Sequence, residues 1–368
     1  MNLSDQITVF YRSWYSFVEK QRSYGEAKWV MIDDLSKSNI IEVDLFNSED
    51  EVVSKLNELI QCVSNSTDLN FPKDETLSRL NDSLYFLEFK DISKESITKL
   101  NGVWWEIPSS EIEDINAKYN TFSHLPSSLN DIIDTEDFLI LLKEKSDYYY
   151  SKVIEHLGLE IVPELNIKTV QVDEKWRNMI TYEDGVLYLV INTHPMHQYT
   201  TLQAYSYAIH EVCGHVLHFS YILENQQDYS HLNQICLHTK ASAFVEGFAH
   251  YIHKYCAYEL FDDDILKYSF EYFRLRFALI QKNAMDIAEE IKTPKEAAVY
   301  HSEVTKEELE SLIQQYEKLS ESKFFMFQTH SYHNGLRWFE SLESKHNSKK
   351  DFLRYMLDHR SMATFVAL

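Results

Sequence analysis

The sequence predicts a mostly α-helical fold with a small antiparallel sheet, and three observations lead to this expectation. Only 7 Gly and 6 Pro occur among 368 residues, so few positions interrupt helices. Apolar residues recur at helical spacing over most of the chain. The segment 165–195 departs from that pattern and shows the alternation and turn signals of strands.

The first part of the chain, residues 1–160, is expected to form helices joined by polar loops. Residues 5–22 carry apolar and aromatic side chains at helical spacing, and residues 136–158 carry a long apolar, tyrosine-rich stripe. Residues 161–368 are expected to hold the small sheet and the remaining helices. The two regions form either separate domains or one continuous domain.

The strand-like segment contains two expected strands. Residues 167–172 alternate like a half-buried strand, and residues 186–192 form a β-branched and aromatic run. Asp184-Gly185 between them is a turn signal. We therefore expect an antiparallel sheet just ahead of the next helix, and an open edge of this sheet could bind an extended peptide by strand addition.

From Leu202 onward the pattern is helical almost to the end of the chain. Thr293-Pro294-Lys295-Glu296 has the order of a capping box with proline at the first helical position. Aromatic-rich helices are expected around residues 324–343 and 349–358.

Charge and cysteine usage exclude several classes of function. The formal net charge of −23 repels phosphate backbones and anionic lipid, so neither nucleic acid nor membrane is an expected partner. No apolar run has the length of a membrane span, and residues 1–6 lack the pattern of a secretory signal. The four cysteines form no CxxC pair, which is typical of free thiols in a reducing, cytoplasmic setting.

The segment His210-Glu211-Val212-Cys213-Gly214-His215 is the most informative in the chain. It places two histidines five residues apart, with a glutamate directly after the first. Glu246 follows 31 residues after His215 as the one carboxylate of an apolar helical segment, 241–249. Because an unpaired buried carboxylate is costly, a cationic partner is expected for it. Two histidines and a distal carboxylate are a ligand set for one Zn²⁺, and the adjacent Glu211 would be the general base.

The spacing of the two histidines has a structural consequence. Residues four apart lie about 40° apart around an α-helix, whereas residues five apart lie roughly 140° apart. We expect a π-type bulge to bring His210 and His215 to one face, with Gly214 easing the distortion. The alternative is that they are simply two of 16 histidines.

Other residues near the motif have plainer interpretations. Cys213 is expected to be a packed, inert thiol rather than a ligand. His250 and His253 follow Glu246 at helical spacing and are expected to be polar groups beside the pocket rather than ligands. Gly214, Gly247 and Gly335 fall in the segments that carry the candidate site residues, where close backbone approach or unusual dihedral angles would require glycine.

The region from about residue 191 to the C-terminus resembles the zinc-peptidase-like bacterial proteins of the domain of unknown function 885 family, within the gluzincin class. The resemblance rests on Asn192-Thr193, on His210-Glu211 followed by Gly214-His215, on Val245-Glu246-Gly247-Phe248-Ala249, on Thr293-Pro294-Lys295-Glu296-Ala297, and on Gln328, Tyr332 and Gly335 in a Gln-x-x-x-Tyr-x-x-Gly pattern.

This resemblance implies a helical gluzincin-like metalloprotein in which His210, His215 and Glu246 bind zinc and Glu211 is the base. The chain departs from the family in two respects. Its histidine motif is one residue shorter and lacks a proline, and the resulting HExxxH spacing is like that of the dipeptidyl peptidase III and tubulin tyrosine carboxypeptidase families. Arg274, Arg276 and Asn283 do not reproduce the family's Arg…Asp…His pattern.

Tyr332 is the expected donor to the oxyanion. It lies one helical turn after Gln328 on the same face, and a phenol stays protonated at neutral pH. The alternative is a core tyrosine, one of 24, in which case His330, His333 and Arg337 are the next donors to consider.

The expected function is cleavage of a peptide or small amide bond by a metal-activated water. Two alternatives stay open at this point. A 2-His-1-carboxylate site also suits non-haem iron and O2 activation. A catalytically inactive, peptidase-like binding protein is the third hypothesis, although the intact Glu211 argues against it.

Overall fold

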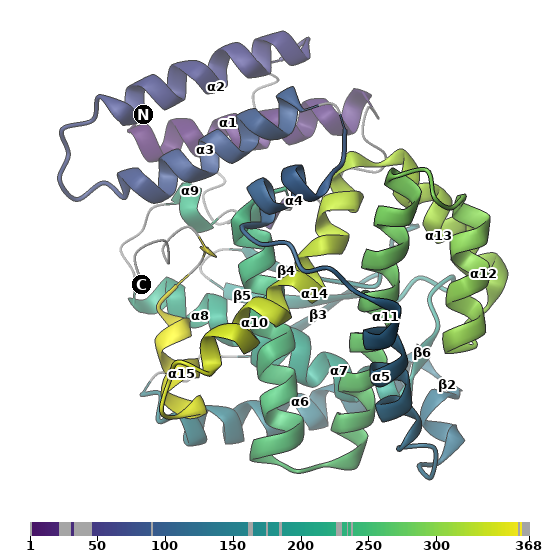
Figure 1. The fold of residues 1–368 in the computed structure, drawn as a ribbon. Coiled ribbons are helices and arrows are strands. Elements are labelled where there is room, and N and C mark those ends of the chain that lie inside the picture. Colours follow the sequence, from purple (N-terminus) through teal and green to yellow (C-terminus); the bar gives the residue numbers. More distant parts are fainter. Residues whose placement is uncertain are drawn as a thin grey trace.

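The structure is a computed structural model, and it describes most of the chain. The described residues are 2–21, 31–32, 46–89, 91–160, 165–173, 176–183, 186–225, 230–233, 235–236, 238–359 and 361–362. Helices dominate these residues, so the predicted mostly α class is confirmed (Figure 1).

The N-terminal helices pack on one another and cover one end of the molecule (Figure 1). Trp14 lies at the centre of their apolar cluster, against the rings of Phe10, Phe86 and Phe324. Phe324 comes from the C-terminal part of the chain, so the cluster also joins the two parts. The elements of this region are α1 (Leu3–Gln21), β1 (Met31–Ile32), α2 (Glu49–Ser64), α3 (Lys73–Glu88) and α4 (Lys94–Asn101). The next helix, α5 (Ser109–Asn120), lies apart from them and packs on Leu275, Ala278 and Leu279 (Figure 1).

The middle of the chain holds the long helix α6 and the small sheets. Its elements are η2 (Ser127–Asn130), β2 (Ile132–Ile133), α6 (Thr135–Leu157), β3 (Asn166–Val170), β4 (Asn178–Glu183), β5 (Val186–Asn192) and β6 (Tyr199–Thr200). The largest sheet has three strands in the order β3-β5-β4. Two short strand pairs, β1 with β7 (Ile235–Cys236) and β2 with β6, join distant parts of the chain.

The expectation of an antiparallel sheet is wrong in one respect, because the three-stranded sheet is mixed. The two predicted strands, β3 and β5, pair in parallel, with Asn166 opposite Tyr188. A strand missed in the sequence, β4, pairs antiparallel with β5. Since β4 ends at Glu183 and β5 begins at Val186, these two strands are adjacent in sequence and pair antiparallel. β3 therefore pairs with the other edge of β5. The predicted turn Asp184-Gly185 lies outside the described residues.

The C-terminal half is almost entirely helical and carries the predicted motifs. Its elements are α7 (Thr201–Tyr207), η3 (Ala208–Val216), α8 (Leu217–Asn225), α9 (Ser230–Asn233), β7 (Ile235–Cys236), α10 (Lys240–Tyr255), η4 (Cys256–Leu260), α11 (Asp264–Ala288), α12 (Pro294–Thr305), α13 (Leu309–Glu321), α14 (Lys323–Glu343) and α15 (Lys349–Leu357).

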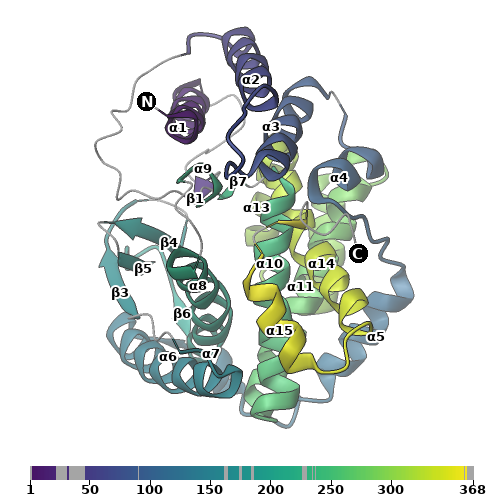
Figure 2. The ribbon, with the colours of Figure 1, turned by 90° about the vertical axis from the view of Figure 1, so that its left-hand side faces the viewer.

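Two groups of elements face each other across the main core (Figure 2). The three-stranded sheet, α6, α7 and α8 lie on one side, and α10, α11, α14 and α15 lie on the other. One apolar cluster runs through both groups and includes residues of α6, η3, α10 and α14. Because α6 belongs to this cluster, the segment with His210 and His215 is packed against a helix from the first part of the chain. A domain boundary at residue 160 stays a prediction.

The helix bounds agree closely with the periodic segments of the sequence. The expected helices 5–22, 136–158, 324–343 and 349–358 correspond to α1, α6, α14 and α15. Thr293 caps α12 with Pro294 at the first helical position, and its side chain and that of Glu296 form the predicted capping box. Within the described part of the chain, no helix combines the length and apolarity needed to cross a bilayer.

Candidate metal centre

The segment with the two histidines is a π-helix, which confirms the predicted irregularity. η3 runs from Ala208 to Val216 and continues directly from α7 into α8. Hydrogen bonds in a π-helix connect residues five apart, so residues at this spacing lie over one another. The rings of His210 and His215 accordingly lie on one side of the helix, with centroids 5.0 Å apart.

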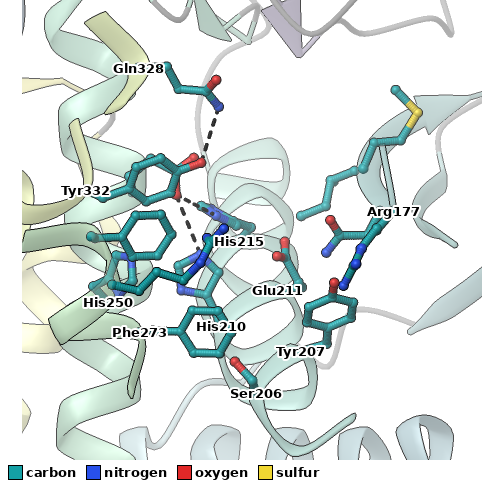
Figure 3. Close-up of a pocket in the computed structure, with 16 residues that line it drawn as sticks. Arg177, Ser206, Tyr207, His210, Glu211, His215, His250, Phe273, Gln328 and Tyr332 are labelled. Atoms are coloured by element: carbon teal, nitrogen blue, oxygen red, sulfur yellow. Dashed lines mark hydrogen bonds and ion pairs between the residues drawn. The ribbon is translucent and has the colours of Figure 1, made fainter. Parts of the chain in front are cut away.

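Helix α10 brings the third residue to this pair. Oε2 of Glu246 lies 3.5 Å from Nε2 of His210 and 3.4 Å from Nε2 of His215. One ligand atom from each of the three residues lies within 4.8 Å of the others. Figure 3 shows the imidazoles of His210 and His215 close together, and Oε2 of Glu246 lies within 3.5 Å of both. The structure thus brings together the three residues that the sequence singles out, and their role as ligands stays a prediction.

These distances fit a bound metal ion. In a tetrahedral zinc site with ligand bonds of 2.0–2.1 Å, two ligand atoms lie about 3.3–3.4 Å apart. Both contacts of Glu246 are close to that separation. Its Oε2 atom is buried and accepts no hydrogen bond among the described residues. A cation held by all three residues would satisfy this atom.

Burial and charge act on the carboxyl group in opposite directions. Burial alone raises the pKa of Glu246, but the neighbouring His215 and His210 outweigh it and hold the pKa below its usual range. For His215 the two effects have the opposite signs. Burial lowers its pKa, but the carboxylate of Glu246 outweighs burial, so the pKa of His215 lies above its usual value. A carboxylate that stays ionised in a buried position is the form that binds a divalent cation.

Glycines set the separation of the helices that carry the site. A Cβ atom on Gly214 of η3 would lie 2.7 Å from Cβ of Ala249 on α10. A Cβ atom on Gly247 of α10 would lie 2.6 Å from the backbone carbon of Gly335 on α14. Both distances are far below an ordinary carbon–carbon contact of about 3.5–4.0 Å. The alternative of unusual dihedral angles is wrong here, because none of these three glycines has a positive φ.

Glu211 lines a cavity that is also lined by His210 and His215. The cavity has a volume of about 340 Å³, and residues of β4, α7, η3, α10, α11 and α14 line it. In Figure 3, Glu211 and Tyr332 lie on opposite sides of His210 and His215. A bond placed in the cavity would therefore have a carboxylate on one side and a phenol on the other. This arrangement can supply a base and a hydrogen-bond donor to the same reacting group.

Tyr332 is both packed and part of the cavity wall. Its ring stacks on Phe277 with centroids 4.1 Å apart, and Nε2 of Gln328 donates to its hydroxyl at 3.2 Å. Burial, with added effects of Glu246 and Glu211, raises the pKa of Tyr332 well above its ordinary value. The phenol therefore keeps its proton. The alternative donors His330, His333 and Arg337 are not among the residues lining this cavity.

The remaining residues near the motif occupy separate positions. His250 lines the cavity, and its ring centroid lies 4.6 Å from that of His210. Burial, followed by the nearby His210, lowers the pKa of His250 well below its usual value. His253 is buried against Phe270 and does not line the cavity. Cys213 is buried in the apolar core, and burial raises the pKa of its thiol.

Several cavity residues have no recognisable signal in the sequence. Arg177, which directly precedes β4, lines the cavity near Glu211 and Tyr207 (Figure 3). Arg276 of α11 also lines it and is held by Glu307, at 3.4 Å, and by Gln315. Arg177 adjoins a strand that the sequence did not show, so no local pattern could have identified it.

Comparisons with known proteins indicate the fold but no activity. No protein-family model matches the chain, and no curated protein matches it. Its fold is similar to "the putative lipoprotein from Colwellia psychrerythraea", with a TM-score of 0.59 and 16% identity, covering 88% of this chain and 63% of that chain. It is also similar to "a putative lipoprotein of unknown function from Shewanella oneidensis", with a TM-score of 0.54 and 13% identity, covering 86% of this chain and 71% of that chain. The chain therefore spans less than two thirds of the length of the first of these proteins.

Proposed function

We propose that the chain is a zinc-dependent hydrolase that cleaves a peptide bond or a small amide bond. The observation that carries the proposal is the convergence of His210, His215 and Glu246 in one cavity with the carboxylate of Glu211. The resemblance of these motifs to the domain of unknown function 885 family and to gluzincins supports the same activity.

His210, His215 and Glu246 would hold the metal. When bound, zinc supplies a Lewis acid that polarises the scissile carbonyl and lowers the pKa of water in the site toward ~7. Glu211 accepts the proton of the attacking water and delivers it to the leaving amine. Tyr332 donates its O–H to the carbonyl oxygen as negative charge develops there.

The position of β4 favours a peptide as the substrate. β4 lies at the edge of the sheet, and Asn178, Met179 and Ile180 from its first half line the cavity. Among the described strands, β4 pairs only with β5. Its outer backbone groups could pair with an extended peptide, which would lie along the strand with one of its bonds at the metal site.

Glu211 also separates this proposal from the two alternatives. The same ligand set suits a non-haem iron oxygenase, but that chemistry has no use for a carboxylate base beside the first histidine. A binding protein without activity has no use for it either. We further propose that the protein works in a reducing, cytoplasmic setting, in line with four cysteines, all within the described residues, that form no disulfide. Fractionation of cells would test the location.

The decisive experiment combines metal analysis with a peptide-library cleavage screen on the purified protein. We expect one zinc per chain and cleavage that does not depend on O2. Glu211→Gln is the matched control, because the amide keeps the shape of the side chain and cannot accept the proton. It should retain zinc and lose about 10²–10⁴-fold in turnover. Iron with O2-dependent turnover, or wild-type turnover in Glu211→Gln, would refute the proposal.

A further inference from the structure

Three cavities follow one another along α11. The first is the cavity of the metal centre, whose α11 residues are Phe273, Arg276 and Phe277. The second, of about 270 Å³, shares Phe273 with it and adds Tyr272. The third, of about 230 Å³, lies at Tyr268 and shares other wall residues with the second. We call this row of cavities the α11 track.

The length of the track can be estimated from the helix. Phe277 follows Tyr268 by nine positions along α11, and a helix rises 1.5 Å per residue, so the track covers roughly 13–14 Å. An extended chain advances about 3.3 Å per residue. The track therefore has room for about four residues of an extended polypeptide beyond the metal centre.

At the end of the track farthest from the metal centre, two stacked tyrosines form part of the cavity wall. The rings of Tyr119 and Tyr268 stack with centroids 5.1 Å apart and an interplanar angle of 15°. Their hydroxyl oxygens lie 2.9 Å apart, and Nδ2 of Asn130 donates to the Tyr268 hydroxyl at 3.0 Å. Tyr119 and Asn130 line both the second and the third cavity. These contacts hold the rings in place without a ligand, which lowers the entropic cost of binding.

The charged side chains of the second cavity have partners, and the residues that line the third cavity are uncharged. In the second cavity, Glu307 faces Arg276 at 3.4 Å and His301 at 3.3 Å. Nζ of Lys306 donates to the carbonyl oxygen of Glu303 at 2.7 Å. Beyond the metal centre, the track therefore offers mainly aromatic rings and neutral hydrogen-bonding groups. Such a surface suits an uncharged polypeptide segment with apolar or aromatic side chains.

We propose that the α11 track binds about four residues of an extended, uncharged polypeptide segment on one side of the bond placed at the metal centre. This inference rests on the proposed hydrolase function and deepens it, because it makes the substrate a polypeptide rather than a small amide. The shared walls at Phe273, Tyr119 and Asn130 provide the continuity from the metal centre to the third cavity.

The test uses binding, so that it does not depend on turnover. Two ladders of fluorescein-labelled peptides, extended by one neutral residue at a time toward either terminus, are titrated against zinc-loaded Glu211→Gln protein by fluorescence anisotropy. We expect one ladder to gain about three- to tenfold in affinity per residue, with the gain ending near four residues. Two flat ladders, or no binding of any peptide, would overturn the proposal.

Two tryptophan substitutions locate the effect. Ser123 is exposed and lines the third cavity, whereas Ser128 is exposed nearby and lines none of the three cavities. Added to the Glu211→Gln protein, Ser123→Trp should remove the gain from the last residues of the ladder, and Ser128→Trp should keep it. Thermal midpoints verify that both variants fold. Equal ladders in the two variants would place the peptide elsewhere.

Wild-type turnover of the same peptides separates the two proposals. If the ladder binds as expected but no peptide is cleaved, the hydrolase proposal fails and the track stands. If peptides are cleaved with a kcat/KM that does not change with length, the track fails and the hydrolase stands.

Discussion

The contact between Gly214 and Ala249 leads to a quantitative prediction about metal binding. A Cβ atom on residue 214 would lie 2.7 Å from Cβ and 2.8 Å from Cα of Ala249. Restoring an ordinary contact of about 3.5–4.0 Å requires η3 and α10 to separate by roughly 1 Å. Gly214→Ala therefore moves His210 and His215 away from Glu246, which lies on α10.

The expected loss of metal affinity is larger than the expected loss of stability. Metal–ligand distances tolerate only about ±0.2 Å, so a shift of about 1 Å disrupts the ligand set. We expect zinc affinity to fall by at least the roughly 10–100-fold that is usual when a supporting residue changes. Overpacking costs about 1–3 kcal/mol, and the better helix propensity of Ala returns about 1 kcal/mol. Gly214→Ala should thus fold and bind zinc weakly.

The assay is a zinc titration in competition with a chromophoric chelator, with thermal midpoints measured on the metal-free proteins. Gly335→Ala is the matched control, because its Cβ would lie 2.7 Å from Cα of Gly247 and so would separate α14 from α10. The three candidate ligands are on η3 and α10, so this control should retain zinc affinity and lose turnover as Tyr332 moves away. Wild-type zinc affinity in a folded Gly214→Ala protein would refute the reasoning.

Three further predictions concern single side chains. His210→Ala, His215→Ala and Glu246→Ala should each abolish stoichiometric zinc, and mass spectrometry that finds full metal content in all three would show that the site lies elsewhere. Tyr332→Phe should retain zinc and lower kcat about 10²–10³-fold, as for loss of an oxyanion donor; a kcat within a few-fold of wild type would leave Tyr332 as a packing residue on Phe277. Thr293→Ala should lower the free energy of unfolding by about 0.5–2 kcal/mol through loss of the α12 cap, without a change in zinc content; an unchanged denaturation midpoint would contradict this.

Features encoded within a short segment could be predicted from the sequence. The bounds of α1, α6, α14 and α15 follow from apolar periodicity, since the pattern and the helix have the same period. The π-helix follows from the spacing of His210 and His215, because only that geometry brings both rings to one face. The cap at Thr293 is likewise a local signal.

Features that depend on partners distant in the sequence could not be predicted. The parallel pairing of β3 with β5 depends on β4, whose sequence did not show a strand pattern. Arg177 enters the cavity only because β4 lies beside η3. The second and third cavities of the α11 track are formed by segments as far apart as residues 119 and 307. No local pattern distinguishes their tyrosines from the other tyrosines of the chain.

The candidate site combines both kinds of feature: part of it lies in one short segment, and part depends on how distant helices pack. His210, Glu211 and His215 share one π-helical turn, so a single segment sets the position of the proposed base relative to two of the three candidate ligands. Glu246 and Tyr332 come from α10 and α14, and their positions depend on how closely those helices approach. Gly214 sets the first approach and Gly247 with Gly335 sets the second. One contact joins α10 to η3 and the other joins α10 to α14. We therefore expect that the proposed metal binding and the proposed stabilisation of the oxyanion can be weakened separately by changing one glycine at a time. A site held by one rigid segment would not allow this separation.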